Sequence, residues 1–299
     1  MIVNIDSGSG FCWGVVRTVH IAEETLLAHK GKRDVYVLGH IIHNPKEMQR
    51  LAALGLKTIA VADFPTIAHS NAIVLIRAHG EPPATYQAAW ENGIELIDAT
   101  CPVVTKLQER VRKFFDQGYQ IIIFGKKDHA EIVGLRGVVG DRCLVVLSPD
   151  EAVEVADVTK KTVLFSQTTM DRATFYLIRD VLKERISDLL VEPKAEPGAM
   201  LQTKDTICGQ VSGREENLAR FAASNDVMLF VAGKASSNGK VLFEVSRSAN
   251  PATHFIEEID EIQPEWFTNV NTVGISGATS TPQWYMEEVR DWLLSHYGT

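Results

Sequence analysis

The chain has 299 residues, of which 45% are hydrophobic and 23% are charged, and this ordinary globular composition excludes a disordered or collagen-like chain. Lys and Arg number 30 and Asp and Glu 38, so the formal net charge of −8 argues against a general binder of nucleic acid or membrane surfaces. No apolar run reaches the roughly 20 residues of a membrane span, and the first residues show no signal peptide.

The first predicted elements surround the cysteines. Three of the four cysteines lie between a predicted strand and a predicted helix: Cys12 between 3–6 and 15–26, Cys101 between 94–98 and 104–114, and Cys208 between 204–207 and 218–221. Cys143 lies inside the apolar run 142–147, which predicts a buried strand and an inert thiol. Without a CxxC pair or a disulfide pattern, we expect a reducing cytoplasm, where a special cysteine is a metal ligand or a nucleophile.

The same pattern continues after each of these three cysteines. An apolar strand ending in glycine follows 24–27 residues later, at 35–38, 121–124 and 228–232. Four residues beyond each glycine stands a polar side chain, namely His43, His129 and Ser237. A further strand follows at 73–76, 162–165 and 272–275, and it runs into a polar turn that contains His79, Thr168 or Ser280. The sequence therefore predicts three similar α/β repeats.

The polar residues of each repeat follow the carboxyl ends of predicted parallel strands, where ligands of α/β proteins gather. Three repeats around a pseudo-threefold axis would bring three cysteines to one centre. Three thiolates leave open one position of a tetrahedral metal, or one iron of a 4Fe–4S cluster, and open positions are where metals do chemistry. The run 191–198 is the clearest predicted linker, and it precedes the third repeat.

Other side chains suggest acid catalysis and anion binding. Glu131, two residues after His129, is a natural general acid. His43 with Asn44, and the run 77–80, offer donors to phosphate. The loop 233–240 is no Walker A motif, but its glycines and its Ser236-Ser237-Asn238 suit an anion. The glycines at 8, 10 and 14 are a weak dinucleotide signal, because Cys12 interrupts them.

A set of motifs, taken together, resembles the IspH/LytB family of 4-hydroxy-3-methylbut-2-enyl diphosphate reductases over nearly the whole chain. In chain order, the motifs are Gly10-Phe11-Cys12, His43-Asn44, Arg77-Ala78-His79-Gly80, Asp98-Ala99-Thr100-Cys101-Pro102, His129-x-Glu131, Gln167-Thr168-Thr169, Asp205-Thr206-Ile207-Cys208, Ser236-Ser237-Asn238 and Ser280-Thr281-Pro282. The resemblance implies a cloverleaf of three α/β domains around a 4Fe–4S cluster. The domains would be 13–100, 101–205 and 206–299, with 1–12 joined to the third.

The resemblance also implies an activity, the last step of the methylerythritol phosphate route to isoprenoids. The substrate, an allylic diphosphate, would lose its hydroxyl as water, giving isopentenyl and dimethylallyl diphosphate. An electron donor protein of the ferredoxin or flavodoxin type would supply the electrons. Three groups of residues are implied: cluster ligands Cys12, Cys101 and Cys208; the proton-delivery residues Glu131, His129 and Thr168, of which the last two also contact substrate; and diphosphate ligands His43, His79, Ser236, Ser237, Asn238 and Ser280.

Several positions depart from the commoner family pattern. Ser9 stands where Arg is usual, Trp13 where Ala is common and Ala130 where Pro is common, while 211–213 replaces a Thr-Thr-Asn stretch. None of them removes an implied ligand or acid. Two rival interpretations are a cluster-dependent lyase or synthase, like a quinolinate synthase, and an iron–sulfur redox sensor. The His-x-Glu acid and the convergent phosphate donors disfavour both, and turnover of an allylic diphosphate would separate the three.

Overall fold

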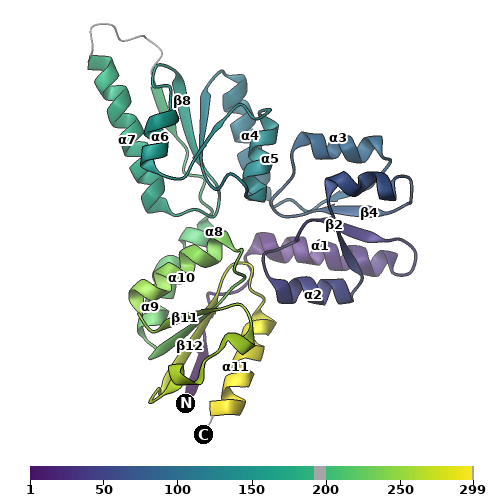
Figure 1. Ribbon diagram of the computed structural model, residues 1–299, viewed down its shortest axis with the longest axis vertical. Coiled ribbons are helices and arrows are strands. Elements are labelled where there is room, and N and C mark those ends of the chain that lie inside the picture. The colour runs from purple at the N-terminus through teal and green to yellow at the C-terminus, as the bar shows by residue number, and fades with distance from the viewer. Residues whose placement is uncertain (192–199, 298–299) are drawn as a thin grey trace. The chain divides into compact units, whose positions relative to one another are not determined.

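The computed structural model describes residues 1–191 and 200–297. They fall into two compact units. Figure 1 labels the main helices and strands of the chain. The first unit contains residues 1–30, 40–57 and 209–299, and the second contains 31–39 and 58–208. The predicted linker 191–198 lies outside the described residues except for its first residue, which ends a helix.

The first unit is built on sheet A, whose parallel strands lie in the order β1-β12-β10-β11. The strands are β1 (Ile2–Ile5), β10 (Val227–Val231), β11 (Thr253–Ile256) and β12 (Thr272–Gly277). The helices of this unit are α1 (Trp13–His29), α2 (Pro45–Ala53), α8 (Gly209–Ser212), α9 (Glu215–Ala223), α10 (Ser237–Ala249) and α11 (Gln283–Tyr297), with 3₁₀ turns at Ile259–Glu261 and Pro264–Phe267.

Sheet A is covered on both faces, as a parallel sheet requires. On one face, Tyr285, Met286 and Val289 of α11 pack against Leu229 and other residues of the strands. On the other, Leu218 of α9 and Leu242 of α10 pack around Phe230. All of these side chains are buried, so the sheet is a rigid base for the loops at its carboxyl edge.

The second unit contains two more sheets. Sheet B has the order β3-β2-β4-β5, with β2 (Val35–Leu38), β3 (Leu56–Ile59), β4 (Ile73–Ile76) and β5 (Glu95–Asp98). Sheet C has the order β7-β6-β8-β9, with β6 (Gln120–Phe124), β7 (Leu144–Val146), β8 (Lys161–Ser166) and β9 (Met200–Thr203). The helices are α3 (Pro83–Glu91), α4 (Pro102–Asp116), α5 (Ala130–Val138), α6 (Pro149–Val155) and α7 (Arg172–Val191), with a 3₁₀ helix at Val61–Ile67.

The three parallel sheets confirm the predicted α/β class. In each sheet the strand that precedes a cysteine is an edge strand: β5 before Cys101, β9 before Cys208, and β1, from the start of the chain, before Cys12. The strand predicted at 204–207 is wrong, because β9 ends at Thr203 and Asp205 turns the chain by accepting a hydrogen bond from the Ile207 N–H at 3.1 Å. The domain boundaries at 13, 101 and 206 stay a prediction.

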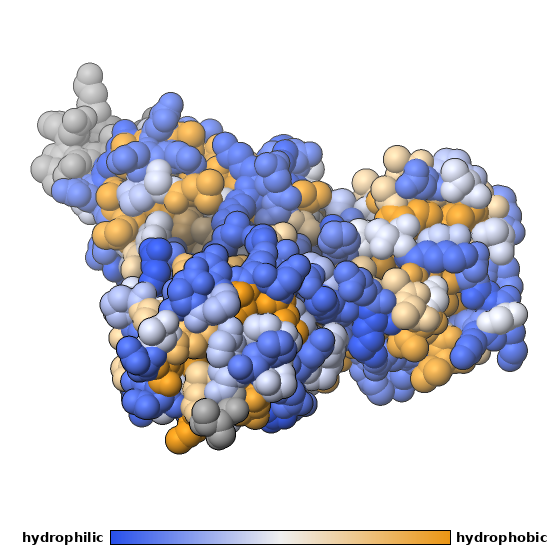
Figure 2. Space-filling view, turned by 60° about the horizontal axis from the view of Figure 1, so that its bottom comes forward, coloured by the Kyte–Doolittle hydropathy of each residue, from blue (hydrophilic) through white to orange (hydrophobic). Residues whose placement is uncertain are grey.

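The central strands have side chains suited to complete burial. Every residue of β4 (IVLI) and of β10 (VMLFV) is buried. On the face drawn in Figure 2, polar side chains surround separate apolar patches. Among the described helices, none combines the length and the apolar character that crossing a bilayer needs.

Candidate active site

Three cysteines lie at matching positions, each at the amino end of a helix. Cys12 is the N-cap of α1, Cys101 is the N-cap of α4, and Cys208 directly precedes α8. The backbone N–H of each donates to a carbonyl in the turn that follows the neighbouring strand: Thr279 at 3.1 Å, Ala78 at 3.0 Å and Thr168 at 2.8 Å, respectively. All three thiols are partly exposed and in no disulfide. The structure thus repeats one backbone arrangement three times around a potential thiolate ligand.

An aspartate to which the sequence assigned no role precedes each of these three cysteines. One carboxylate oxygen of Asp6, Asp98 and Asp205 accepts a hydrogen bond from the backbone N–H two residues later, at 2.9, 2.8 and 3.1 Å. Such a turn fixes the chain between the edge strand and the cysteine. The signal in the sequence was Asp three residues before Cys101 and before Cys208, whereas Asp6 stands six residues before Cys12.

In the second unit, a buried glutamate lies at the start of α5. Glu131 is 1% exposed, and its carboxylate accepts hydrogen bonds from the N–H of Thr168 at 2.7 Å and from its Oγ1 at 2.6 Å. Burial raises the pKa of Glu131 to about 7, although the Thr168 hydrogen bonds lower it. The raised pKa lets Glu131 keep its proton closer to neutral pH than an ordinary carboxyl group does, as a general acid requires.

Two histidines of the second unit lie beside each other, and one of them contacts this glutamate. His129 caps α5, and its Nδ1 accepts a hydrogen bond from the Glu131 N–H at 3.2 Å. The His79 ring meets the His129 ring edge to face, with centroids 5.2 Å apart. Because the backbone of Thr168 also holds Cys208, and that of Ala78 holds Cys101, the second unit gathers six predicted residues: Cys101, Cys208, His79, His129, Glu131 and Thr168.

In the first unit, the start of α10 forms a cradle of donors suited to an anion. Ser236 is the N-cap and accepts from the Gly239 N–H, while its Oγ lies 3.4 Å from the Oγ of Ser280. Asn238 is 3% exposed, and its Oδ1 accepts from the N–H and the Oγ1 of Thr279, both at 2.8 Å. Its Nδ2 is buried and has no hydrogen-bond partner among the described residues. A buried donor costs about 1–3 kcal/mol while unsatisfied, so this atom suits a bound phosphate.

The loop with His43 lies against this cradle. Its neighbour Asn44 caps α2 by accepting from the Glu47 N–H at 3.1 Å. A Cβ on Gly233 would lie 2.3 Å from the carbonyl oxygen of His43, so only glycine permits this approach at the end of β10. The carbonyl of Thr279 holds Cys12, and the first unit therefore gathers the other six predicted residues: Cys12, His43, Ser236, Ser237, Asn238 and Ser280.

Cys143 differs from the other three cysteines. The predicted strand 142–147 is shorter than expected, because β7 begins at Leu144 and Cys143, partly exposed, stands just before it. Burial raises the pKa of the Cys143 thiol to about 11. A thiol that stays protonated is a poor ligand and a poor nucleophile.

Comparison with known proteins identifies the family. The model of the family described as "LytB protein" matches residues 3–294. The chain therefore belongs to the LytB family. The 4-hydroxy-3-methylbut-2-enyl diphosphate reductase of Chloroherpeton thalassium is 46% identical, with 100% of this chain and 98% of the relative aligned. That of Bacteroides thetaiotaomicron is 47% identical, over 97% and 96%.

Two solved structures extend the LytB similarity to the fold. The solved structure of an (E)-4-hydroxy-3-methyl-but-2-enyl diphosphate reductase, the terminal enzyme of the non-mevalonate pathway, has a TM-score of 0.70 and 32% identity, and the match covers 99% of this chain and 100% of that one. The reductase structure from Plasmodium falciparum has a TM-score of 0.85 and 25% identity, covering 99% and 89%.

The unusual positions of this LytB chain leave the local backbone intact. Ser9 donates to the carbonyl of Asp6 at 2.6 Å, and Arg214 donates to the carbonyl of Gly10 at 2.7 Å. Ala130 begins α5 without a proline. Trp13 begins α1 and is 59% exposed.

Proposed function

We propose that this LytB protein is a 4-hydroxy-3-methylbut-2-enyl diphosphate reductase, which catalyses the last step of the methylerythritol phosphate route, otherwise called the non-mevalonate pathway. The products would be isopentenyl and dimethylallyl diphosphate. The observation that carries the proposal is the buried Glu131, held by Thr168, whose backbone also holds Cys208. Reductive dehydroxylation needs an acid beside a redox centre, and the full-length relatives are named as that reductase.

Cys12, Cys101 and Cys208 would hold one 4Fe–4S cluster. Three thiols that follow edge strands and are held by the same backbone hydrogen bond fit such a group, because iron–sulfur clusters are bound by cysteine thiolates. When bound, the cluster supplies single electrons and an iron without a protein ligand, which acts as a Lewis acid. An electron donor protein of the ferredoxin or flavodoxin type would recharge it, and we place the enzyme in the cytoplasm, which keeps its cysteines reduced.

Glu131 would donate the proton that turns the leaving hydroxyl into water. Replacing a C–OH by a C–H consumes two electrons and two protons, of which one leaves in the water and one stays on carbon. The raised pKa keeps a proton on Glu131 near neutral pH, and the Thr168 hydroxyl orients the carboxyl group. His129, whose Nδ1 accepts from the Glu131 N–H, would complete the proton-delivery network and contact the substrate with Thr168.

The diphosphate would bind to hydrogen-bond donors that gather beyond the strand ends. Helix α10 points its amino end, where the helix dipole favours anions, at the place where Ser236 and Ser280 meet. The partnerless Nδ2 of Asn238 would donate to a phosphate oxygen. The whole proposed set is His43, His79, Ser236, Ser237, Asn238 and Ser280.

Anaerobic turnover tests the proposal. The protein, reconstituted with iron and sulfide, is assayed with reduced methyl viologen and the hydroxylated allylic diphosphate, and the products are identified by mass spectrometry. We expect isopentenyl and dimethylallyl diphosphate, with four irons per chain. Cluster-loaded protein that leaves the substrate intact would favour the redox sensor.

Single cysteine replacements test the ligand set. Cys12→Ser, Cys101→Ser and Cys208→Ser should each lose cluster or activity. Cys143→Ser is the matched control, because that thiol has a raised pKa and no equivalent backbone arrangement, and it should keep both. Loss of the cluster in Cys143→Ser would contradict the three-ligand assignment.

A further inference from the structure

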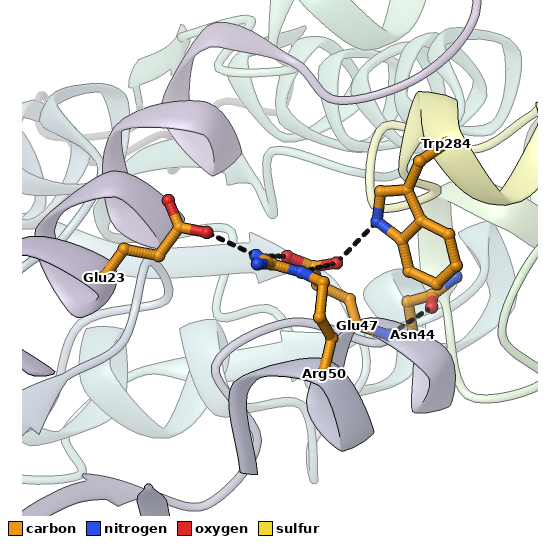
Figure 3. Close-up of polar contacts among 5 residues, drawn as sticks. All are labelled: Glu23, Asn44, Glu47, Arg50 and Trp284. Atoms are coloured by element: carbon orange, nitrogen blue, oxygen red, sulfur yellow. Dashed lines mark hydrogen bonds and ion pairs between the residues drawn. The ribbon is translucent and has the colours of Figure 1, made fainter. Parts of the chain in front are cut away.

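An ionic network around a single buried carboxylate lies in the first unit, outside the set of residues predicted from the sequence (Figure 3). Its centre is Glu47, which is 1% exposed. One carboxylate oxygen accepts from Arg50 Nε and from the indole Nε1 of Trp284, each at 2.9 Å, and the other accepts from Arg50 Nη2 at 2.5 Å. Arg50 Nη2 also contacts Glu23 at 2.6 Å. One guanidinium and one indole thus join three helices.

Each of these helices begins shortly after a proposed site residue. Helix α1, which carries Glu23, starts directly after Cys12. Helix α2, which carries Glu47 and Arg50, starts two residues after His43. Helix α11, which carries Trp284, starts three residues after Ser280. Glu47 and Trp284 stand in the first turns of α2 and α11, so their contact joins the two ends from which His43 and Ser280 extend.

Further contacts tie the α2 end to the rest of the unit. Lys46, next to Glu47, forms a 2.5 Å ion pair with Glu258, and its ammonium lies 5.7 Å from the centroid of the Tyr285 ring of α11. On the other side of the loop, the His43 carbonyl oxygen lies so close to Gly233 that a side chain at that position would not fit. The His43 loop is therefore held at both ends, and a shift of α2 along α11 would move it. Glu47 is separated from Trp284 by 237 residues of sequence, so no local propensity supplies this contact.

We propose that Glu47, Arg50 and Trp284 form a brace that positions His43 toward the diphosphate, using α11 as its fixed point. This proposal rests on the proposed function, because it takes the diphosphate as the ligand of His43. None of the three is a catalytic residue: they act through the helix ends that carry His43 and Ser280.

The physical reason is the cost of leaving Glu47 without its donors. A buried carboxylate must keep its cation and its hydrogen bonds, or the structure relaxes to admit water. Removing the indole N–H takes away one of three donors, so α2 is expected to shift or tilt rather than unfold. A shift of 1 Å at the helix end is enough to misplace a donor, since hydrogen bonds weaken steeply outside their normal distance.

The test is a double-mutant cycle read by pyrophosphate binding. Trp284→Phe removes the indole N–H and keeps an aromatic ring, and His43→Gln removes the imidazole. The affinity of each cluster-loaded protein for inorganic pyrophosphate is measured by anaerobic calorimetry. We expect Trp284→Phe to weaken binding roughly 3–10-fold, the size of one ordinary hydrogen bond, in the wild-type background, and to change it less than twofold when His43 is already replaced.

Two controls separate positioning from a general loss of structure. Trp266→Phe makes the same replacement at a tryptophan that stacks on His254, 4.0 Å between centroids, and it should leave pyrophosphate affinity unchanged. Arg50→Lys is the second variant, because a lysine cannot donate in the forked geometry that Glu47 and Glu23 use, and it should reproduce the Trp284→Phe effect. In turnover, both brace variants should raise KM and change kcat by less than threefold.

Each outcome bears on the brace. Equal weakening in both backgrounds, or no weakening by Trp284→Phe and Arg50→Lys, would overturn it while wild-type turnover still supports the proposed function. If the wild-type protein binds no pyrophosphate and reduces no allylic diphosphate, the assignment of the diphosphate site is wrong. The brace, which depends on that assignment, is then wrong as well.

Discussion

Glu47 and Glu131 are equally buried, at 1% exposure, and each lies in the first turn of a helix that follows a histidine of the proposed site. Their partners differ. Glu47 has the Arg50 guanidinium and the Trp284 indole, whereas Glu131 has only Thr168 and, within the described chain, no ion pair with a cation. Burial with a cation favours a fixed negative charge, and burial without one favours a retained proton. The partners of a buried carboxylate, more than its depth, indicate whether it holds structure or moves protons.

The largest expected effect is on turnover, and it should distinguish Glu131 from Glu47. Glu131→Gln keeps the side-chain shape and removes the acid, so we expect kcat to fall at least ~10²-fold, with the cluster and pyrophosphate binding retained. Glu47→Gln should raise KM instead and lower kcat by less than tenfold. Both constants are measured by varying the substrate up to saturation, with reduced methyl viologen as the electron source. Near-normal turnover by Glu131→Gln would move the proton source to the substrate phosphate or to water.

Glu131→Gln should also change how stability depends on pH. Burial raises the pKa of Glu131 from 4.5 to about 7 in the folded chain. Below pH 4.5 the carboxyl group is protonated in both the folded and the unfolded chain, so its burial does not lower the free energy of unfolding through titration. As the pH rises to about 7, the unfolded chain releases this proton while the folded chain keeps it, so stability falls, by roughly 3 kcal/mol at most.

Glu131→Gln does not titrate and should escape this loss. The difference in unfolding free energy between Glu131→Gln and wild type, both in the same cluster state, should therefore shift in favour of the variant by about 1–3 kcal/mol between pH 5 and pH 8. Urea unfolding at the two pH values measures it. A difference that does not change with pH would mean that Glu131 is ionised in the folded protein.

The sequence was informative where one signal repeats. Apolar runs that end in glycine predicted β2, β6 and β10, because a strand buried on both faces must be apolar throughout. Matched offsets then placed His79, Thr168 and Ser280 in turns beyond strands. The family resemblance, which the comparisons confirm, was carried by short motifs in those same turns. Their catalytic and ligand roles stay predictions.

The sequence could not predict contacts between distant segments. The hydrogen bond from the Trp284 indole N–H to Glu47 depends on how α11 packs, and no sequence pattern near either residue indicates it. Strand β9 was misplaced because the prediction assigned the strand to the four residues directly before Cys208, whereas β9 ends at Thr203 and a turn at Asp205 separates it from the cysteine. The degree to which burial raises the pKa of Glu131 also follows from tertiary packing alone.

The smallest expected effect concerns the Thr168 hydroxyl, which donates a hydrogen bond to the buried carboxylate of Glu131. Thr168 Oγ1 donates to the carboxylate at 2.6 Å and lowers the pKa of Glu131 against the effect of burial. Thr168→Val keeps the side-chain shape, the backbone N–H to Glu131 and the carbonyl that holds Cys208. The carboxylate then loses one donor, so the pKa of Glu131 should rise further.

Because a general acid works only while protonated, kcat of the wild type should fall as the pH rises through the pKa of Glu131. In Thr168→Val this basic limb should move to higher pH by about one unit, the equivalent of about 1.4 kcal/mol, which is a typical worth for a hydrogen bond to a charged group. The profile is recorded with methyl viologen, whose potential does not change with pH. Thr169→Val is the control, since the Thr169 hydroxyl accepts from Gln167 instead. If the basic limb stays in place, or moves to lower pH, the Thr168 hydroxyl does not set the pKa of the proton donor.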